Sequence, residues 1–530
     1  MGWDLRKPLV NMTESGTCPS VIILRYQDGS EGCPSNPARF NNQDYVQLKD
    51  HHLRKGTLFE DTTFPPNSRS LGDMSKLNLK DKVEWLRPAE ILKRQKIIGE
   101  PIFCDGASRF DYGQGNLGDC WFLSAISSLT FQEDLVKEIV HIEQSFINYA
   151  GIFHFKFWRF GKWVDVVIDD LLPTCNNKLV FVHPKNGNEF WVPLLEKAYA
   201  KYETYSLTLK THQVCGSYSY IWGGFPSDAC KDFSGGVHMT KKLREAQTAG
   251  HEIELWLALS RAFQCKSMVC CWTASIGDKL ENNIAHTGLI NKHAYSVTAV
   301  TEVVYGGSKV KLVRVMNPHG KTEWNGNWSD NSDLWTKVNQ EDWKNHLNLN
   351  NGEFWMELKD FCHYFSRVSI CCESPNFIDG DFTCQWTCMI HDGNWVAGTS
   401  SGGSPNHSTF ATNPQYRIQV TNIDKEEQGD KNVFLSLMQK PLQDLTKKTF
   451  LFIGLAVYQV PAGTPQGCLK SSFFKSNTPL KQPPAYTAER ELIEQHSLQP
   501  GEYVIVPFTE KANTADFVLS VYTKTDATIT

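Results

Sequence analysis

The sequence predicts an α+β region followed by an all-β antiparallel sandwich. Its 530 residues exceed what one hydrophobic core usually holds, so we expect about three or four domains. Helix-like and strand-like patterns alternate between residues 56 and 372, and from about residue 373 short strand-like runs separated by polar loops replace them. We therefore predict an N-terminal extension (1–55), two α+β lobes (56–235 and 236–372) and a sandwich (373–530).

The extension mixes Gly, Pro, Asn and charged residues without a sustained hydrophobic period. We interpret it as a segment with little core of its own and expect order to begin near Gly56.

The first lobe is predicted to contain two helices and a hairpin between them. Apolar residues recur at helical spacing between residues 120 and 130. The run "GIFHFKFWRFGKWVDVVIDDLLP" alternates apolar and polar residues on both sides of Gly161, which predicts a hairpin. The run "PLLEKAYAKY" returns to helical spacing.

The second lobe begins at "DFSGGV", residues 232–237. Paired glycines allow backbone rotation at low cost, so Gly235 and Gly236 form a candidate hinge, although an ordinary turn explains them equally well. The run "ELWLALSRAF" then predicts a helix, and "KHAYSVTAVTEVVYGGSKVKLVRVMNP" predicts two strands joined at Gly306–Gly307.

The sandwich is predicted from five runs rich in β-branched and aromatic residues, separated by polar loops. They are "YRIQV", "NVFLSLMQ", "FIGLAVYQV", "EYVIVPF" and "DFVLSVY".

Composition excludes two classes of function. The chain is 41% hydrophobic and 21% charged, with a net charge of -5 that provides no basic field for nucleic acid. We find no run of about 18 apolar residues that could span a bilayer, and the first residues lack the apolar stretch of a signal peptide. We therefore expect a cytoplasmic protein with reduced thiols and no nucleic-acid partner.

Cys120 is a candidate nucleophile because of its position in "GQGNLGDCWFLSAISSL". It would lie in the first turn of the predicted helix, where unpaired backbone N–H groups and the helix dipole favour a thiolate. Gly115 and Gly118 would leave the approach open to a substrate backbone. Gln114 could donate an amide N–H to the oxyanion that forms when Cys120 attacks a carbonyl.

A nucleophilic cysteine also needs a base, and hairpin geometry suggests one. If Gly306–Gly307 closes a two-residue turn, residues whose numbers sum to about 613 face each other. His293 then lies near Asn317, whose amide could orient the imidazole. Each residue also has a structural explanation: Cys120 as a small buried residue, His293 as an edge histidine, and Asn317 as part of a strand-ending turn.

Several longer stretches then show a family resemblance. They are "QGNLGDCWF", "KLVFVHPKNGNEFWVPLLEKAYAKY", "DFSGGV", "HAYSVTAV", "NPHGKTEWNGNWSD" and "NGEFWMELKDF", with "NPQYRIQV", "IGLAVYQVP" and "PGEYVIVP" after them. Together they resemble the calpains, calcium-dependent cysteine proteases of the cytosol. The likeness runs in order from about residue 55 to 525.

The resemblance implies a papain-like protease core split into two lobes and followed by a C2-like β-sandwich. It implies that Cys120 is the nucleophile, His293 the general base and acid, Asn317 the residue that orients the imidazole, and Gln114 the oxyanion donor. The activity implied is calcium-activated limited cleavage of protein substrates. The alternative is a weakly active or inactive relative that serves as a calcium- or membrane-responsive binding module.

Calcium is the implied cofactor, held by hard oxygen donors in both lobes. The family's positions correspond in the first lobe to backbone carbonyls around Gly106 and to Asp111 and Glu189. In the second lobe they correspond to Glu323, Asp330 and Glu353, with Asn351 beside them.

Three departures from the calpain pattern affect these expectations. Asn351 stands where calpains usually carry an acid, so we expect a weaker calcium site. His319 replaces a tryptophan beside the cleft and brings a second imidazole near the chemistry. The sequence has no D-x-D-x-D-G loop, so the resemblance is to a form without the penta-EF-hand domain, either a shortened form or a branch that lacks this module, and we expect no small regulatory subunit.

The sandwich loop that is strongly acidic in conventional calpains reads "NIDKEEQGDKN" here, with lysines among its acids. Any contact with phospholipid through the sandwich is therefore expected to be weak.

Overall fold

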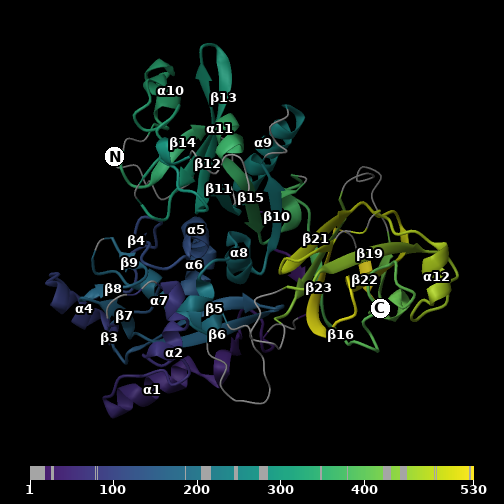
Figure 1. Ribbon diagram of the computed structural model, residues 1–530, viewed down its shortest axis with the longest axis horizontal. Helices are drawn as coiled ribbons and strands as arrows, with labels where there is room; N and C mark the ends of the chain where they lie inside the picture. The colour runs from purple at the N-terminus through teal and green to yellow at the C-terminus, as the bar shows by residue number, and fades with distance from the viewer. Residues whose placement is uncertain are drawn as a thin grey trace.

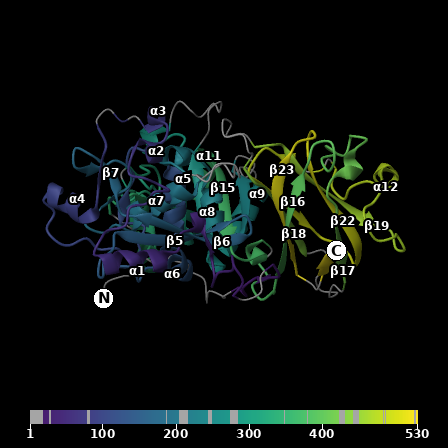
Figure 2. The same ribbon diagram turned by 90° about the horizontal axis from the view of Figure 1, so that it is seen from below.

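The computed structural model describes residues 18–25, 29–77, 79, 82–185, 187–203, 216–243, 249–273, 284–320, 322–346, 349–378, 380–421, 431–441, 450–482, 484, 486–524 and 527–529. Figure 1 shows three groups of elements: a first lobe in purple and blue, a second lobe in teal and green above it, and a sandwich in green and yellow to one side. In the view from below, the sandwich again lies beside the two lobes (Figure 2).

The first lobe packs helices around short sheets. Its helices are α1 (Tyr45–Lys55), α2 (Ser68–Leu71), α3 (Met74–Leu77), α4 (Pro88–Gln95), α5 (Cys120–Leu129), α6 (Glu133–Val140), α7 (Trp191–Tyr202) and α8 (Pro226–Ser234). Its strands are β2 (Ala38–Arg39), β3 (Glu84–Leu86), β4 (Tyr112–Gly113), β5 (Ile152–Arg159), β6 (Lys162–Asp169), β7 (Leu172–Cys175), β8 (Lys178–Leu179) and β9 (His183–Pro184). The hairpin predicted around Gly161 is confirmed as the antiparallel pair β5–β6.

Order begins earlier than the sequence predicts. Helix α1 already lies before the predicted start of order, and Gly56 caps the C-terminus of this helix with a φ of 62°. Strand β2 pairs with β6, and β1 (Ile22–Ile23) pairs with β16 (Thr387–Trp395) of the sandwich. The prediction failed because α1 has no fully buried residue, so its sequence carries only a weak hydrophobic period.

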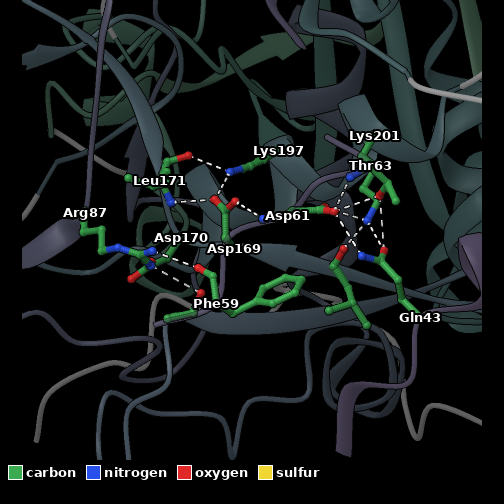
Figure 3. A network of polar contacts seen from close by, with 12 residues as sticks. Gln43, Phe59, Asp61, Thr63, Arg87, Asp169, Asp170, Leu171, Lys197 and Lys201 are labelled. Atoms are coloured by element: carbon green, nitrogen blue, oxygen red, sulfur yellow. Dashed lines mark hydrogen bonds and ion pairs between the residues drawn. The ribbon is translucent and has the colours of Figure 1, made fainter. Parts of the chain in front are cut away.

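Buried ion pairs of the first lobe lie where this N-terminal segment meets it, and Gln43 of the segment donates to Asp61 Oδ1 at 3.0 Å (Figure 3). Lys201 donates from Nζ to Asp61 Oδ2 at 2.7 Å and to the Val167 carbonyl at 2.5 Å. Lys197 donates to Asp169 Oδ1 at 2.5 Å, and Asp169 Oδ2 accepts from the backbone N–H of Asp61 at 2.7 Å. Because each buried charge has a partner of opposite sign, these pairs are tolerated inside the lobe.

The second lobe is a six-stranded sheet in the order β10-β15-β11-β12-β13-β14. Its strands are β10 (Val237–Lys242), β11 (Met268–Thr273), β12 (Ala294–Tyr305), β13 (Ser308–Met316), β14 (Glu353–Glu357) and β15 (Phe365–Cys372), with helices α9 (Ala249–Gln264), α10 (Gln340–Trp343) and α11 (Leu358–Tyr364). The predicted turn at Gly306–Gly307 is confirmed, since Tyr305 pairs with Ser308. The register shifts between Val297 and Ala299.

Helix α5 joins the two lobes. Every residue of this helix is buried, and it packs against β11 and β12 of the second lobe. Ser127 Oγ lies 2.7 Å from Ser296 Oγ, and Ser128 donates to the Val269 carbonyl at 2.9 Å. The hydrophobic core of the first lobe therefore continues into the sheet of the second.

The two glycines of the candidate hinge, Gly235 and Gly236, have structural roles in the folded chain. Gly235 has a φ of 64° and ends α8, and a Cβ there would lie 2.6 Å from Trp158 Cδ1. A Cβ on Gly236 would lie 2.2 Å from the Cys372 carbonyl oxygen. A cap and a close approach explain both glycines, and their use as a hinge stays a prediction.

The C-terminal part is a sandwich of two five-stranded sheets, ordered β1-β16-β23-β18-β21 and β20-β19-β22-β17-β24. Their remaining strands are β17 (Tyr416–Val420), β18 (Val433–Gln439), β19 (Ile453–Val460), β20 (Tyr486–Thr487), β21 (Glu491–His496), β22 (Gly501–Thr509), β23 (Ala515–Thr523) and β24 (Ala527–Ile529), with helix α12 (Ser471–Ser476). All five predicted runs form strands, and apolar residues of both sheets share one core.

Two buried ion pairs fasten the sandwich to helix α8 of the first lobe. Arg490 donates to both carboxylate oxygens of Asp232, at 2.6 and 3.1 Å, and Lys231 donates to Glu491 Oε1 at 3.0 Å. Both acceptor carboxylates are buried. The start of β21 therefore has a fixed position against α8.

Two further predictions concern membranes. In the part of the chain that the structure describes, no helix combines the length and apolar character needed to cross a membrane. The lysine-containing acidic loop of the sandwich falls mostly within residues 422–430, outside the described residues. Contact with phospholipid stays a prediction.

Replacing Lys201 by methionine should lower the free energy of unfolding by about 3–5 kcal/mol, because Asp61 would keep a buried charge without a cation. The midpoint of urea unfolding, followed by tryptophan fluorescence, measures the effect. The double variant Lys201→Met/Asp61→Asn should recover most of the loss, whereas exposed Lys309→Met should change little. Equal losses in the single and double variants would show that the charge pair is not the cause.

Candidate active site

Cys120 is the first residue of α5, as the sequence predicts, and it lies against the start of β12. The backbone N–H of Ala294 donates to its sulfur. Burial nevertheless raises the pKa of the Cys120 thiol to about 11, despite that hydrogen bond and the helix N-terminus. The expected thiolate is therefore disfavoured in this conformation, because loss of solvent outweighs the helix dipole.

His293 immediately precedes β12 and is fixed at both its backbone and its ring. Its backbone N–H donates to Thr273 Oγ1 at 3.0 Å, and its Nε2 lies 2.9 Å from Asn317 Oδ1. Asn317 directly follows β13. The hairpin argument is confirmed: two residues 24 apart in sequence become hydrogen-bonded neighbours.

The orientation of Asn317 sets the proton position on His293. Asn317 Nδ2 donates to the carbonyl and to Oγ1 of Thr322, both at 3.1 Å, so Oδ1 faces the imidazole. Nε2 of a neutral His293 must then carry the proton and donate it to Asn317. This leaves the lone pair on Nδ1, the nitrogen that can accept a proton.

A second imidazole stands beside the first. The ring centroids of His293 and His319 are 4.8 Å apart and their planes are tilted by 40°. Burial, with a smaller contribution from His319, lowers the pKa of His293 to about 3. With Cys120 near 11 and His293 near 3, both groups are neutral at pH 7.

The side chain of Gln114 and the surroundings of Gly115 and Gly118 differ from what the sequence predicts. Gln114 Nε2 donates to the Leu117 carbonyl at 2.8 Å and to Asp119 Oδ1 at 3.1 Å, so its amide must turn before it can serve an oxyanion. A Cβ on Gly115 would lie 2.0 Å from the Phe181 carbonyl oxygen, and one on Gly118 would lie 2.9 Å from Trp222 Nε1. Gly115 and Gly118 therefore serve close packing rather than an open approach.

The carboxylates predicted in the first lobe come together beside the loop at Gly106. Asp111 Oδ2 accepts from the Ser108 N–H at 2.6 Å, and Glu189 Oε1 accepts from the Asp105 N–H at 2.7 Å. Burial and the neighbouring charges of Asp111 and Asp105 raise the pKa of Glu189 to about 7. This set gathers negative charge in a partly desolvated place.

The second predicted set is more crowded. Glu323 Oε1 accepts from the Gly352 N–H at 2.7 Å, and Asn351 Oδ1 accepts from the Glu353 N–H at 2.9 Å. Asp330 Oδ1 is buried and has no hydrogen-bond partner among the described residues. Burial, with the charges of Glu323 and Glu353, raises the pKa of Asp330 to about 7.

Glu353 itself forms a salt bridge between the lobes. Arg109 Nε and Nη2 donate to its two carboxylate oxygens at 2.9 and 2.8 Å, and Arg314 Nε lies 3.4 Å from Oε1. Both carboxylate oxygens are therefore engaged by guanidinium groups in this conformation. Arg109 comes from the loop that carries Gly106 and Asp111, so the salt bridge links the two predicted sets.

Comparison with known proteins agrees with this geometry. Residues 59–372 match the family described as "Calpain family cysteine protease", and residues 391–522 match "Calpain large subunit, domain III". The chain is 40% identical to the calpain-1 catalytic subunit of Pongo abelii, over 97% of this chain and 71% of that protein. It is 38% identical to calpain-9 of Homo sapiens, over 92% of this chain and 68% of that protein.

The chain belongs to the calpain family of cysteine proteases. Sequence reasoning singled out Cys120, His293 and Asn317 but missed three residues of the same region. They are Arg109, which binds Glu353, Thr273, which accepts from the His293 N–H, and Trp222, which packs against Gly118. Each partner is at least 20 residues away in the sequence. Since none belongs to a local pattern, only the folded chain reveals them.

Alkylation by iodoacetamide tests the protonation state of Cys120 in this calpain. Without calcium, labelling of Cys120 should be slow at pH 7, since a thiol with a pKa of about 11 is only about one part in 10,000 thiolate. The rate should rise about tenfold per pH unit between pH 7 and 9. Peptide mass spectrometry measures each cysteine, with exposed Cys468 as the control for reagent. A Cys120 rate that is independent of pH would contradict the neutral pair.

Proposed function

We propose that this calpain is a calcium-activated cysteine endopeptidase that makes limited cuts in proteins through Cys120, His293 and Asn317. The observation that carries the proposal is the hydrogen bond from His293 Nε2 to Asn317 Oδ1. This hydrogen bond leaves the lone pair of His293 on Nδ1, where it can accept a proton. His293 directly precedes Ala294, whose backbone N–H donates to the Cys120 sulfur. That arrangement supplies a nucleophile, a base and a residue that orients the base.

In the proposed reaction, the Cys120 thiol gives its proton to His293 Nδ1, and the thiolate attacks the carbonyl carbon of the scissile peptide. The tetrahedral oxyanion requires a donor, and Gln114 is the proposed one once its amide has turned. The imidazolium then gives the proton to the leaving amine, which releases one product and leaves an acyl-enzyme. His293 next deprotonates a water molecule that hydrolyses the thioester and restores Cys120.

The two carboxylate sets fit calcium by the chemistry of their donors. Asp111, Glu189 and carbonyls around Gly106 would hold one ion, and Glu323, Asp330 and Asn351 would hold another, since calcium takes six to eight oxygen ligands. Glu353 would take part only if it released Arg109. When bound, the ion supplies positive charge that compensates the gathered carboxylates. The unpartnered buried Oδ1 of Asp330 supports this fit.

Calcium titration tests the proposed activity. Millimolar calcium should switch on cleavage of casein by the wild type, and Cys120→Ala should abolish it because no other group replaces the attacking sulfur. Gel analysis of casein fragments, with chelator as the blank, measures the effect. Cleavage that persists in Cys120→Ala, or that needs no calcium, would contradict the proposal.

Asp330→Asn separates calcium binding from folding. The amide can still accept from the Leu349 N–H, so the melting temperature in chelator should be unchanged or higher. The calcium concentration for half-maximal cleavage should rise about tenfold, because the proposed site loses a charged ligand. Glu341→Gln, at an exposed acid outside the proposed sites, is the matched control. An unchanged calcium requirement would remove Asp330 from the calcium ligands.

A further inference from the structure

A cluster of two histidines and one aspartate lies in the first lobe, outside both proposed calcium sets. His141, His154 and Asp165 each place one ligand atom within 4.8 Å of the other two. His154 Nδ1 is 2.7 Å from Asp165 Oδ1. All three side chains are mostly buried, with exposed fractions of 20%, 15% and 15%. The donor set is two imidazoles and one carboxylate.

The fold brings these residues together from three elements. His141 follows the last residue of α6 and caps this helix in the left-handed conformation, with a φ of 50°. His154 lies on β5 and Asp165 on β6, and the register of the hairpin makes them diagonal neighbours on one face. The cluster therefore joins the end of a helix to the hairpin against which that helix packs.

Aromatic stacking holds the two imidazoles in place. The rings of His141 and His154 are parallel within 6°, with centroids 4.2 Å apart. The Tyr45 ring covers the other face of His154 at 3.8 Å. An imidazole binds a metal in its own ring plane, so two parallel stacked rings do not point at one ion, and His141 must rotate out of the stack before it can share a metal with His154.

One nitrogen of the cluster lacks a partner. His141 Nε2 is buried without a hydrogen-bond partner among the described residues, whereas Nδ1 lies 3.7 Å from Glu143 Oε1. The Glu143 carboxylate lies beside Nδ1, so Nε2 is the nitrogen that we assign to the cluster.

We propose that His141, His154 and Asp165 form a structural site for a divalent transition metal, with Zn²⁺ as the ion and water completing the coordination. Two imidazoles and a carboxylate suit zinc, whereas calcium prefers oxygen alone. The metal would replace the proton shared by His154 Nδ1 and Asp165 Oδ1 and take the free Nε2 of His141.

Metal binding requires the His141 ring to leave the stack and the ligand atoms to move closer together. Zinc bonds of about 2.1 Å in a tetrahedron place ligand atoms about 3.4 Å apart, so the cluster would contract by somewhat more than 1 Å at its widest separation. The nearby Lys156 ammonium does not oppose the metal with a free charge, because it donates to Glu138 Oε1 at 2.7 Å. Binding would tie α6 to β5 and β6 and stabilise the first lobe.

Cobalt(II), which replaces zinc and is visible by absorption, tests this site in the full chain without calcium. Equilibrium dialysis should give the wild type one more bound cobalt than His141→Ala. Asp165→Asn, which keeps an oxygen beside His154, should weaken that binding at least tenfold. Exposed His286→Ala is the matched control and should bind as the wild type does. The wild type should also gain a few degrees in melting temperature with Zn²⁺, and His141→Ala should not.

The spectrum separates this site from the chain's thiols. Cobalt bound to His141, His154 and Asp165 should lack the near-ultraviolet charge-transfer band that thiolate ligands produce. Equal cobalt stoichiometry and affinity in the wild type, His141→Ala and Asp165→Asn would overturn the proposal, as would a cobalt spectrum of thiolate type alone. If His141→Ala fails to fold, Asp165→Asn alone decides. These outcomes do not depend on peptidase activity.

Discussion

The contact between helix α5 and strand β12 is the constraint on which the proposed catalytic centre depends. Helix α5 begins with Cys120, β12 begins one residue after His293, and the hydrogen bond from the Ala294 N–H to the Cys120 sulfur joins the two starting points. The serine pair Ser127–Ser296 fixes the same contact further along. The packing that brings the cysteine to the histidine also removes water from both. Desolvation then favours the uncharged form of each, so proximity and activation oppose each other in this conformation.

Buried charge pairs perform a related task over longer distances. Lys201 and Asp61 join α7 to the chain that follows α1, Arg490 and Asp232 attach the sandwich, and Arg109 and Glu353 connect the lobes. Such pairs add little net stability, because desolvation offsets most of their attraction, but an unmatched partner is costly. They therefore favour one relative placement of the segments they join. The Arg109–Glu353 pair connects the loop that carries Gly106 and Asp111 to the start of β14, and so joins the two carboxylate sets.

His319 and Asn351 lie close to the groups that the proposed chemistry uses. His319 faces His293 at ring-contact distance and helps to lower its pKa, and a tryptophan there would supply no ionisable group. Asn351 turns its oxygen to the Glu353 N–H instead of adding a carboxylate to the second set.

The sequence by itself determined the elements whose cause is local. Alternating apolar residues and glycine turns predicted the β5–β6 and β12–β13 hairpins, and the second turn placed His293 beside Asn317, because the geometry of a two-residue turn fixes the register that follows. It also predicted all five sandwich runs and the position of Cys120 at a helix start. Tertiary structure decided what depends on distant segments: the burial that keeps Cys120 and His293 neutral, the inward turn of Gln114, the Arg109–Glu353 bridge, and the meeting of His141 with His154 and Asp165. Desolvation and pairing are set by whatever the fold packs around a group, and no local pattern records that.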